Sequence, residues 1–80
     1  MEIIINIIKT ERGYNYRNAE SGKLVATVNE GRNKPGVYYW ELPCEHGWGN
    51  EAQAHYQLQE VLRQRADNLG IGINFNNYNF

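Results

Sequence analysis

The sequence is poor in the residues that crosslink a chain or anchor it in a membrane. Cys44 is the single cysteine among 80 residues, so no disulfide can form within the chain, and we expect a cytoplasmic location. No apolar run approaches the roughly 20 residues of a membrane span. The run Ile3–Ile8 is too short for a signal peptide and follows Glu2 rather than a positive region. Because the sequence starts at Met1 without a leader, we expect a complete gene product.

Residues suited to catalysis or metal binding are also scarce. Ser21 is the only serine, and it lies in a predicted turn. Cys44 and His46, with His55 further along, form the only cluster of soft ligands, and their spacing matches no standard zinc site. Neighbouring carboxylates oppose the thiolate that a cysteine nucleophile needs. The glycines match no phosphate-binding pattern. We therefore predict that the protein is not an enzyme and has no cofactor or metal.

Basic residues are absent from a long central part of the chain. The net charge is only −1, yet no Lys or Arg occurs from Pro35 to Leu62. The charged side chains of that stretch are Glu41, Glu45, Glu51 and Glu60. We therefore expect an acidic region on the surface, which would steer association with a basic partner.

What the sequence does contain is a clear pattern of strands. Alternation of side-chain type predicts strands over Glu2–Thr10, Tyr14–Arg17, Leu24–Asn29, Val37–Leu42 and Ile71–Phe75. Glycine-rich clusters separate most of them. Gly47-Trp48-Gly49 is expected to be an irregular connection, and the tail beyond Phe75 is expected to fray unless it docks.

The strongest pattern predicts an amphipathic helix from Asn50 to Leu69. Asn50 is a suitable N-cap, Gln53 completes a capping box, and Gly70 is placed to end the helix. The apolar stripe comprises Ala54, Leu58, Val61, Leu62 and Leu69, and the opposite face carries Tyr56, Glu60, Arg63 and Asp67. Arg65 lies within the stripe, so we expect it to reach solvent or to pair with a carboxylate such as Glu41.

These elements predict one α+β domain spanning residues 1–80. Its sheet is expected to be antiparallel with four to five strands, a meander plus a C-terminal strand beside the first strand. The helix would pack on one face and leave the other face open. Ile4 and Ile8 on that open face would suit a homodimer, and a monomer is equally compatible with the sequence.

Two surfaces are candidates for function. A protein partner would be bound by acidic and aromatic residues of the second half, namely Glu41, Glu45, Trp48, Glu51, Tyr56, Glu60 and Arg63. Alternatively, aromatic and basic residues on the sheet would bind nucleic acid by stacking and phosphate contacts, namely Tyr14, Tyr16, Arg17, Arg32 and Lys34.

Two parts of this plan resemble known families. The segment Tyr39–Cys44, continuing through Gly47 and Gly49 to Glu51-Ala52, resembles the strand–turn–helix segment of HicB-type antitoxins. Three strands followed by a helix that opens with Glu51-Ala52 resemble AP2-type and integrase arm-binding domains, which read DNA with the sheet. Either resemblance implies a nucleic-acid-binding regulator.

In its overall format, the chain resembles the small phage proteins that disable host defences, the anti-CRISPR proteins in particular. The shared features are a short chain, a compact α+β plan, a segregated acidic surface and no catalytic set. This resemblance implies an inhibitor in the host cytoplasm that occludes a basic surface of a CRISPR-Cas complex without any chemistry. It is the leading hypothesis, and the nucleic-acid-binding domain is the alternative.

Overall fold

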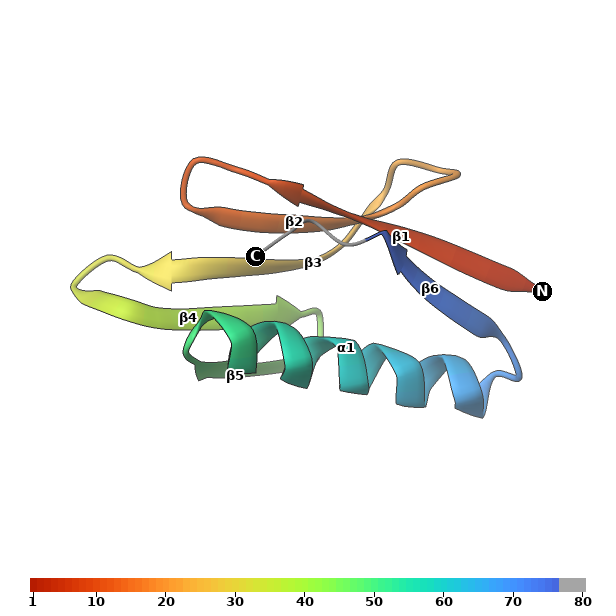
Figure 1. Ribbon diagram of the computed structural model, residues 1–80. Coiled ribbons are helices and arrows are strands. Elements are labelled where there is room, and N and C mark those ends of the chain that lie inside the picture. The colour runs from red at the N-terminus through yellow and green to blue at the C-terminus, as the bar shows by residue number, and fades with distance from the viewer. Residues whose placement is uncertain (77–80) are drawn as a thin grey trace.

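The computed structural model describes residues 1–76 as six strands and one helix (Figure 1). The strands are β1 (Glu2–Lys9), β2 (Gly13–Asn18), β3 (Leu24–Gly31), β4 (Lys34–Leu42), β5 (Glu45–Gly49) and β6 (Gly72–Asn76), and the helix is α1 (Glu51–Asn68). The α+β class is as predicted. The expected fraying of residues 77–80 falls outside the described part of the chain. Within residues 1–76, no helix combines the length and apolar character needed to cross a membrane.

All strands belong to one mixed sheet in the order β5-β4-β3-β2-β1-β6. The prediction placed the last strand beside the first, and β6 does pair with β1, but the two strands are parallel rather than antiparallel. The cause is the additional strand β5, which reverses the chain once more before α1 begins (Figure 1). The helix therefore returns the chain to the end of the sheet where β1 starts.

Strand β5 was predicted as an irregular connection, and that prediction was wrong. It pairs antiparallel with β4, with Leu42 opposite Glu45 and Trp40 opposite Gly47. A Cβ atom at Gly47 would lie 2.5 Å from Nε1 of Trp40, so only glycine fits beneath the indole. Glycines usually weaken a strand, so Gly47 argued against one in the sequence. Here a glycine is required because the Trp40 indole occupies the space of its side chain.

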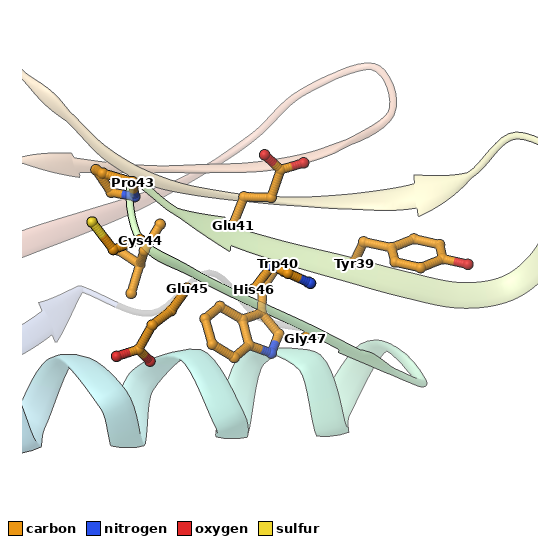
Figure 2. A pocket seen from close by; sticks show the side chains of 9 residues that line it. Tyr39, Trp40, Glu41, Pro43, Cys44, Glu45, His46 and Gly47 are labelled. Atoms are coloured by element: carbon orange, nitrogen blue, oxygen red, sulfur yellow. The ribbon is translucent and has the colours of Figure 1, made fainter.

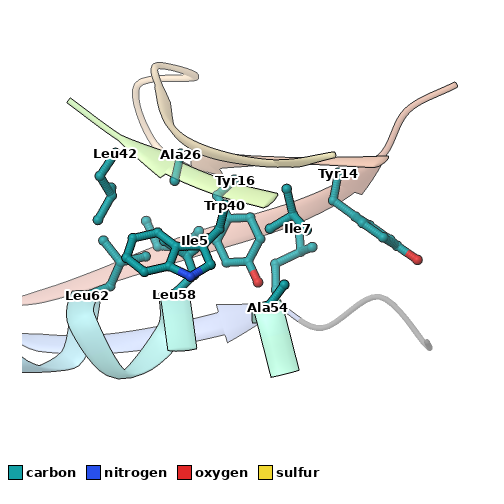
Figure 3. Packing of buried hydrophobic residues seen from close by; sticks show 11 residues of the cluster. Ile5, Ile7, Tyr14, Tyr16, Ala26, Trp40, Leu42, Ala54, Leu58 and Leu62 are labelled. Atoms are coloured by element: carbon teal, nitrogen blue, oxygen red, sulfur yellow. The ribbon is translucent and has the colours of Figure 1, made fainter. Parts of the chain in front are cut away.

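The core lies between α1 and one face of the sheet, which curls so that both of its edges approach the helix (Figures 1 and 3). The helix contacts β4 and β5 at one edge and β6 at the other. The buried apolar side chains from the sheet are Ile5, Ile7, Tyr14, Tyr16, Ala26, Val28, Trp40 and Leu42, and those from the helix are Ala54, Leu58, Leu62 and Ala66. Among residues 1–76, no helix or strand packs on the other face of the sheet, which is called the open face below.

Both ends of α1 carry the predicted signals. The side chain of Asn50 accepts a 2.9 Å hydrogen bond from the backbone N–H of Gln53, and the Gln53 side chain accepts one of 2.9 Å from the Asn50 N–H. At the C-terminus, Gly70 has φ +69°, a conformation that favours glycine. The capping box and the terminating glycine are therefore confirmed.

The predicted apolar stripe of α1 is correct except at its end. Leu69 was expected in the core, but it is the C-cap residue and is 73% exposed. The chain turns at this point through hydrogen bonds from Ile71 N–H to the Ala66 carbonyl (2.9 Å) and from Gly70 N–H to the Asp67 carbonyl (3.0 Å). Ala66 is buried in the last turns of the helix in place of Leu69.

Candidate binding surfaces

The hairpin β4–β5 presents an aromatic pair on the open face of the sheet. Alternation along β4 buries Trp40 and Leu42 under the helix and turns Tyr39 and Glu41 the other way (Figure 2). Trp48 lies opposite Tyr39 in the register, so its indole shares the open face. Sequence reasoning had proposed Trp48 but not Tyr39, because the side covered by the helix was not known.

The two tryptophans of the hairpin have opposite environments. Trp40 is buried, and its Nε1 donates a 2.9 Å hydrogen bond to the side-chain oxygen of Gln57 on α1. Trp48 is 63% exposed. Trp48 and Tyr39 line a hollow of about 390 Å³ together with Lys34 and Val37. Such a large exposed ring beside a concavity is typical of an anchor residue in a binding surface.

A second hollow, of about 500 Å³, lies at the hairpin turn and is lined by residues 39–47 (Figure 2). Tyr39 lines both hollows. Glu41 and His46 are opposite each other in the register and share the open face. This part of the face therefore offers a carboxylate, and the Lys34 side of Tyr39 offers an ammonium group.

The middle of the open face carries uncharged polar side chains beside the exposed Ile8 and the charged Arg17. Asn15 pairs with Thr27 across β2 and β3, and Asn29 pairs with Tyr39 across β3 and β4. Towards the β6 edge, the amide of Asn76 donates a 2.7 Å hydrogen bond to the side-chain oxygen of Asn6. Amides can both donate and accept hydrogen bonds, so these asparagine side chains suit polar groups of either charge.

The predicted protein-binding residues are divided between the two sides of the molecule. Glu41 and Trp48 lie on the open face of the sheet, whereas Tyr56, Glu60 and Arg63 belong to the helix on the other side. Glu45 and Glu51 are also on the helix side. The seven residues therefore do not form one continuous surface, because β5 turns successive side chains to opposite faces.

Much of the negative charge on the helix side has a partner. The carboxylate oxygen of Glu45 lies 3.3 Å from a guanidinium nitrogen of Arg65, and that of Glu60 lies 3.1 Å from one of Arg63. The Glu51 carboxylate accepts a 3.0 Å hydrogen bond from the Tyr14 hydroxyl. Arg65 was expected to extend to solvent or to pair with Glu41, and the observed partner is Glu45. Tyr56 is 66% exposed on the outer side of α1. This side is less acidic than the sequence suggested.

The predicted nucleic-acid-binding residues are also dispersed. Tyr14 and Tyr16 were expected on an accessible sheet face, but they are 3% and 0% exposed and lie in the core, so they offer no stacking surface in this structure. Arg17 is on the open face and donates a 2.9 Å hydrogen bond to the Gly22 carbonyl. Alternation shows which residues share a face, and it does not show which face the helix covers.

Arg32 and Lys34 remain exposed at the turn between β3 and β4. This turn lies at the same end of the sheet as the turn between β1 and β2, since the Glu30 N–H donates a 3.0 Å hydrogen bond to the Arg12 carbonyl. Lys34 also lines the hollow beside Trp48. Basic and aromatic side chains are therefore close together here, although the rings are not the predicted ones.

A polar network crosses the core between α1 and β2. Gln59 Nε2 donates a 3.2 Å hydrogen bond to the Tyr16 oxygen, and the Tyr16 hydroxyl is 2.5 Å from Nδ1 of His55. Because the Tyr16 oxygen accepts from Gln59, its own hydrogen can be donated to Nδ1 of a neutral imidazole at His55. Sequence reasoning had considered His55 only as a metal ligand.

Burial determines the ionisation of this network. It lowers the pKa of His55 to about 4, although the nearby Glu51 charge acts in the opposite direction. Burial also raises the pKa of Tyr16 to about 12. The pKa of Tyr14 is raised by burial and by its hydrogen bond to Glu51. Tyr16 and His55 are both buried, so the pair lies within the core.

The remaining predicted ligands do not converge. Cys44 is exposed in the turn of the hairpin, while His55 is buried under the sheet. Among residues 1–76, no three His, Cys, Asp or Glu side chains come together as a metal site would require. No candidate metal site can therefore be built from these residues.

No family model, no curated protein and no solved structure matches this chain.

Proposed function

We propose that this protein is a non-enzymatic binding protein whose working surface is the open face of its sheet, centred on Trp48 and Tyr39. In this proposal it occupies a surface of a host nucleoprotein complex, as small phage proteins that inhibit CRISPR-Cas systems do. The observation that carries the proposal is the 63% exposed indole of Trp48 beside Tyr39 and a hollow of about 390 Å³.

Three features support a surface that binds without chemistry. Trp48 belongs to a paired strand, so its backbone is already fixed and little entropy is lost when the ring is buried by a partner. Glu41 shares the face and would meet a basic group of the partner. The imidazole and phenol with the most perturbed pKa values, those of His55 and Tyr16, lie in the core, away from this face.

The test is a binding assay with one variant on each side of the molecule. The immobilised protein is titrated with purified CRISPR effector–guide complexes of several types, and the affinity is compared with that of Trp48→Ala and Tyr56→Ala. Tyr56 is a matched control because it is equally exposed, at 66%, but lies on the helix side. Loss of an anchor costs about 2 kcal/mol or more, so Trp48→Ala should weaken binding roughly thirtyfold.

Tyr56→Ala should leave that affinity nearly unchanged. If Tyr56→Ala abolished binding and Trp48→Ala did not, the working surface would be the helix side and the proposal would be wrong. If no effector complex bound at micromolar concentrations, the inhibitor function would be refuted for the types tested.

A second candidate function uses the same face to bind single-stranded nucleic acid. The observation in its favour is the position of Lys34 beside the rings of Tyr39 and Trp48, since stacking on rings and contact with phosphates are the two parts of such binding. Its assay is titration with an oligothymidylate, followed by Trp fluorescence, at low and high salt. Binding that disappears at high salt supports this candidate. Absence of binding at low salt refutes it.

Reversing the charge of Glu41 separates the two candidates. Glu41→Lys should weaken binding to a basic protein surface and should strengthen binding to nucleic acid, because the partner's charge has the opposite sign in the two cases. Glu60→Lys, on the helix side, is the control for the change in net charge and should have little effect on either. The direction of the Glu41→Lys effect therefore identifies the class of partner.

A further inference from the structure

One end of the molecule, here called the apolar end, is formed by the C-terminus of α1, the start of β1 and the start of β6 (Figure 1). It contains a small cavity of about 170 Å³ between the helix and the sheet. Aliphatic side chains form its walls, including Ile3 and Val25 from the sheet, Leu62 from the helix and Ile73 from β6. An apolar cavity of about 150 Å³ accepts a group the size of benzene, so this open hollow has room for a single leucine side chain.

A leucine of the same chain stands beside this cavity without entering the core. Leu69 lines the cavity edge and is 73% exposed, because it is the C-cap residue and the chain turns at Gly70. Met1 is at the same end, since its carbonyl accepts a 3.0 Å hydrogen bond from the Gly72 N–H, and it is largely exposed. The apolar end therefore combines a hollow with projecting apolar groups.

We propose that two copies of the chain dock through their apolar ends, with Leu69 of each copy seated in the cavity of the other. A twofold interface makes every contact twice, so it requires a projection and a matching hollow on the same surface. The apolar end provides both. A partner of a different kind would need only the hollow, and the exposed Leu69 would then have no counterpart.

The charges at the edge of the cavity also fit a second copy. Arg65 lines the cavity and lies 3.3 Å from Glu45, and Asp67 is exposed in the same part of the helix. Both side chains of the Arg65–Glu45 pair are partly exposed, so the pair can be exchanged between two copies related by a twofold axis. An edge with both signs complements itself, whereas a strongly charged partner would meet repulsion from one of the two signs.

This interface is separate from the proposed binding surface. The apolar end lies between the helix and the sheet, whereas Trp48 and Tyr39 are on the open face. A dimer formed in this way keeps both open faces accessible and presents two copies of the Trp48 surface. The inference does not depend on the proposed function.

The test is the oligomeric state in solution, measured by sedimentation over a concentration series from micromolar to millimolar. The wild-type chain should sediment as a dimer at the upper concentrations. Leu69→Asp introduces a charge at both cavities of the dimer and should raise the dissociation constant roughly hundredfold, because two leucines lose their burial. Leu69→Met keeps an apolar side chain and should retain the dimer.

The matched control is Ile8→Asp, an exposed isoleucine at the other end of β1 on the open face. It should leave the dimer intact. A dimer lost in Ile8→Asp but kept in Leu69→Asp would place the interface on the open face and overturn the inference. A wild-type chain that stays monomeric at millimolar concentration would also overturn it. Because Leu69 is exposed, circular dichroism should give the same helix content and melting temperature for Leu69→Asp as for the wild type at concentrations where both are monomeric.

Discussion

The buried histidine makes the stability of the fold depend on pH in a way that can be measured. His55 is neutral in the folded protein, and its pKa is lowered by burial from 6.5 to about 4. In the unfolded chain the imidazole returns to its ordinary pKa, so the unfolded chain binds a proton more tightly than the folded protein between these two values. The stabilising contribution is therefore complete above about pH 6.5 and is lost as the pH falls towards 4.

The size of the loss follows from the same shift. Each pKa unit corresponds to about 1.4 kcal/mol, and the proton-binding equilibrium converts the shift at His55 into a loss of about 2 kcal/mol between pH 7 and pH 5. A domain of this size has a total stability on the order of 4–12 kcal/mol. The loss is therefore a large fraction of the total and should lower the midpoint of urea unfolding visibly.

The assay is urea unfolding at pH 7 and pH 5, followed by circular dichroism, in the wild type and two variants. His55→Asn removes the titrating group and keeps a side-chain oxygen that can accept from Tyr16. It should be less stable than the wild type at pH 7 and should lose about 2 kcal/mol less than the wild type on acidification. His46→Asn removes the exposed histidine of the hairpin and should behave as the wild type. If wild type and His55→Asn lost the same stability, the coupling of His55 to folding would be disproved.

Three further changes test how the fold is held together, each measured by urea unfolding at pH 7. Asn50→Ala removes the hydrogen bond to the Gln53 N–H and should cost about 1 kcal/mol, and Asn50→Asp should restore most of it. Gly47→Ala places a Cβ atom 2.5 Å from the Trp40 indole and should cost about 1–3 kcal/mol, with a shift in Trp40 fluorescence, so an unchanged spectrum would refute the predicted contact. Leu58→Ala opens a cavity at a fully buried site and should cost about 2–5 kcal/mol; a cost under 1 kcal/mol would contradict its place in the core.

The helix was the element that the sequence predicted best, because its ends carry local signals. The hydrogen bonds of Asn50 and the positive φ of Gly70 depend on residues within a few positions in the chain. Leu69 was misplaced because periodicity continues past the residue at which the chain turns. An apolar residue at the C-cap can either pack or project, and the local sequence does not distinguish these outcomes.

The sheet was predicted less well because its errors arise from contacts between distant residues. The glycines at 47 and 49 conceal β5 until the Trp40 ring, seven residues before Gly47, is seen to occupy the space above it. That single extra strand changes the direction of β6 relative to β1. A local error in one strand therefore became a global error in topology.

The exposure of the candidate residues was predicted in part. Trp48 was identified from its residue type and is exposed, whereas Tyr14 and Tyr16 were assigned to an accessible face and are buried. Tyr39 was not among the predicted binding residues. It precedes the buried Trp40, and alternation along β4 therefore turns it to the open face. The decisive fact is which face of the sheet the helix covers, and this depends on the packing of the whole domain rather than on any one strand.

The parallel pairing of β1 with β6 also determines how the fold would respond to a stretching force. Glu2 lies opposite Gly72 and Asn6 lies opposite Asn76, so the start of β1 and the end of β6 are at opposite ends of the pair. Force applied between Met1 and Asn76 would pull the two strands along each other and would load their hydrogen bonds together rather than one after another. The protein should therefore resist extension from these two points far better than extension that peels one hairpin strand from its neighbour.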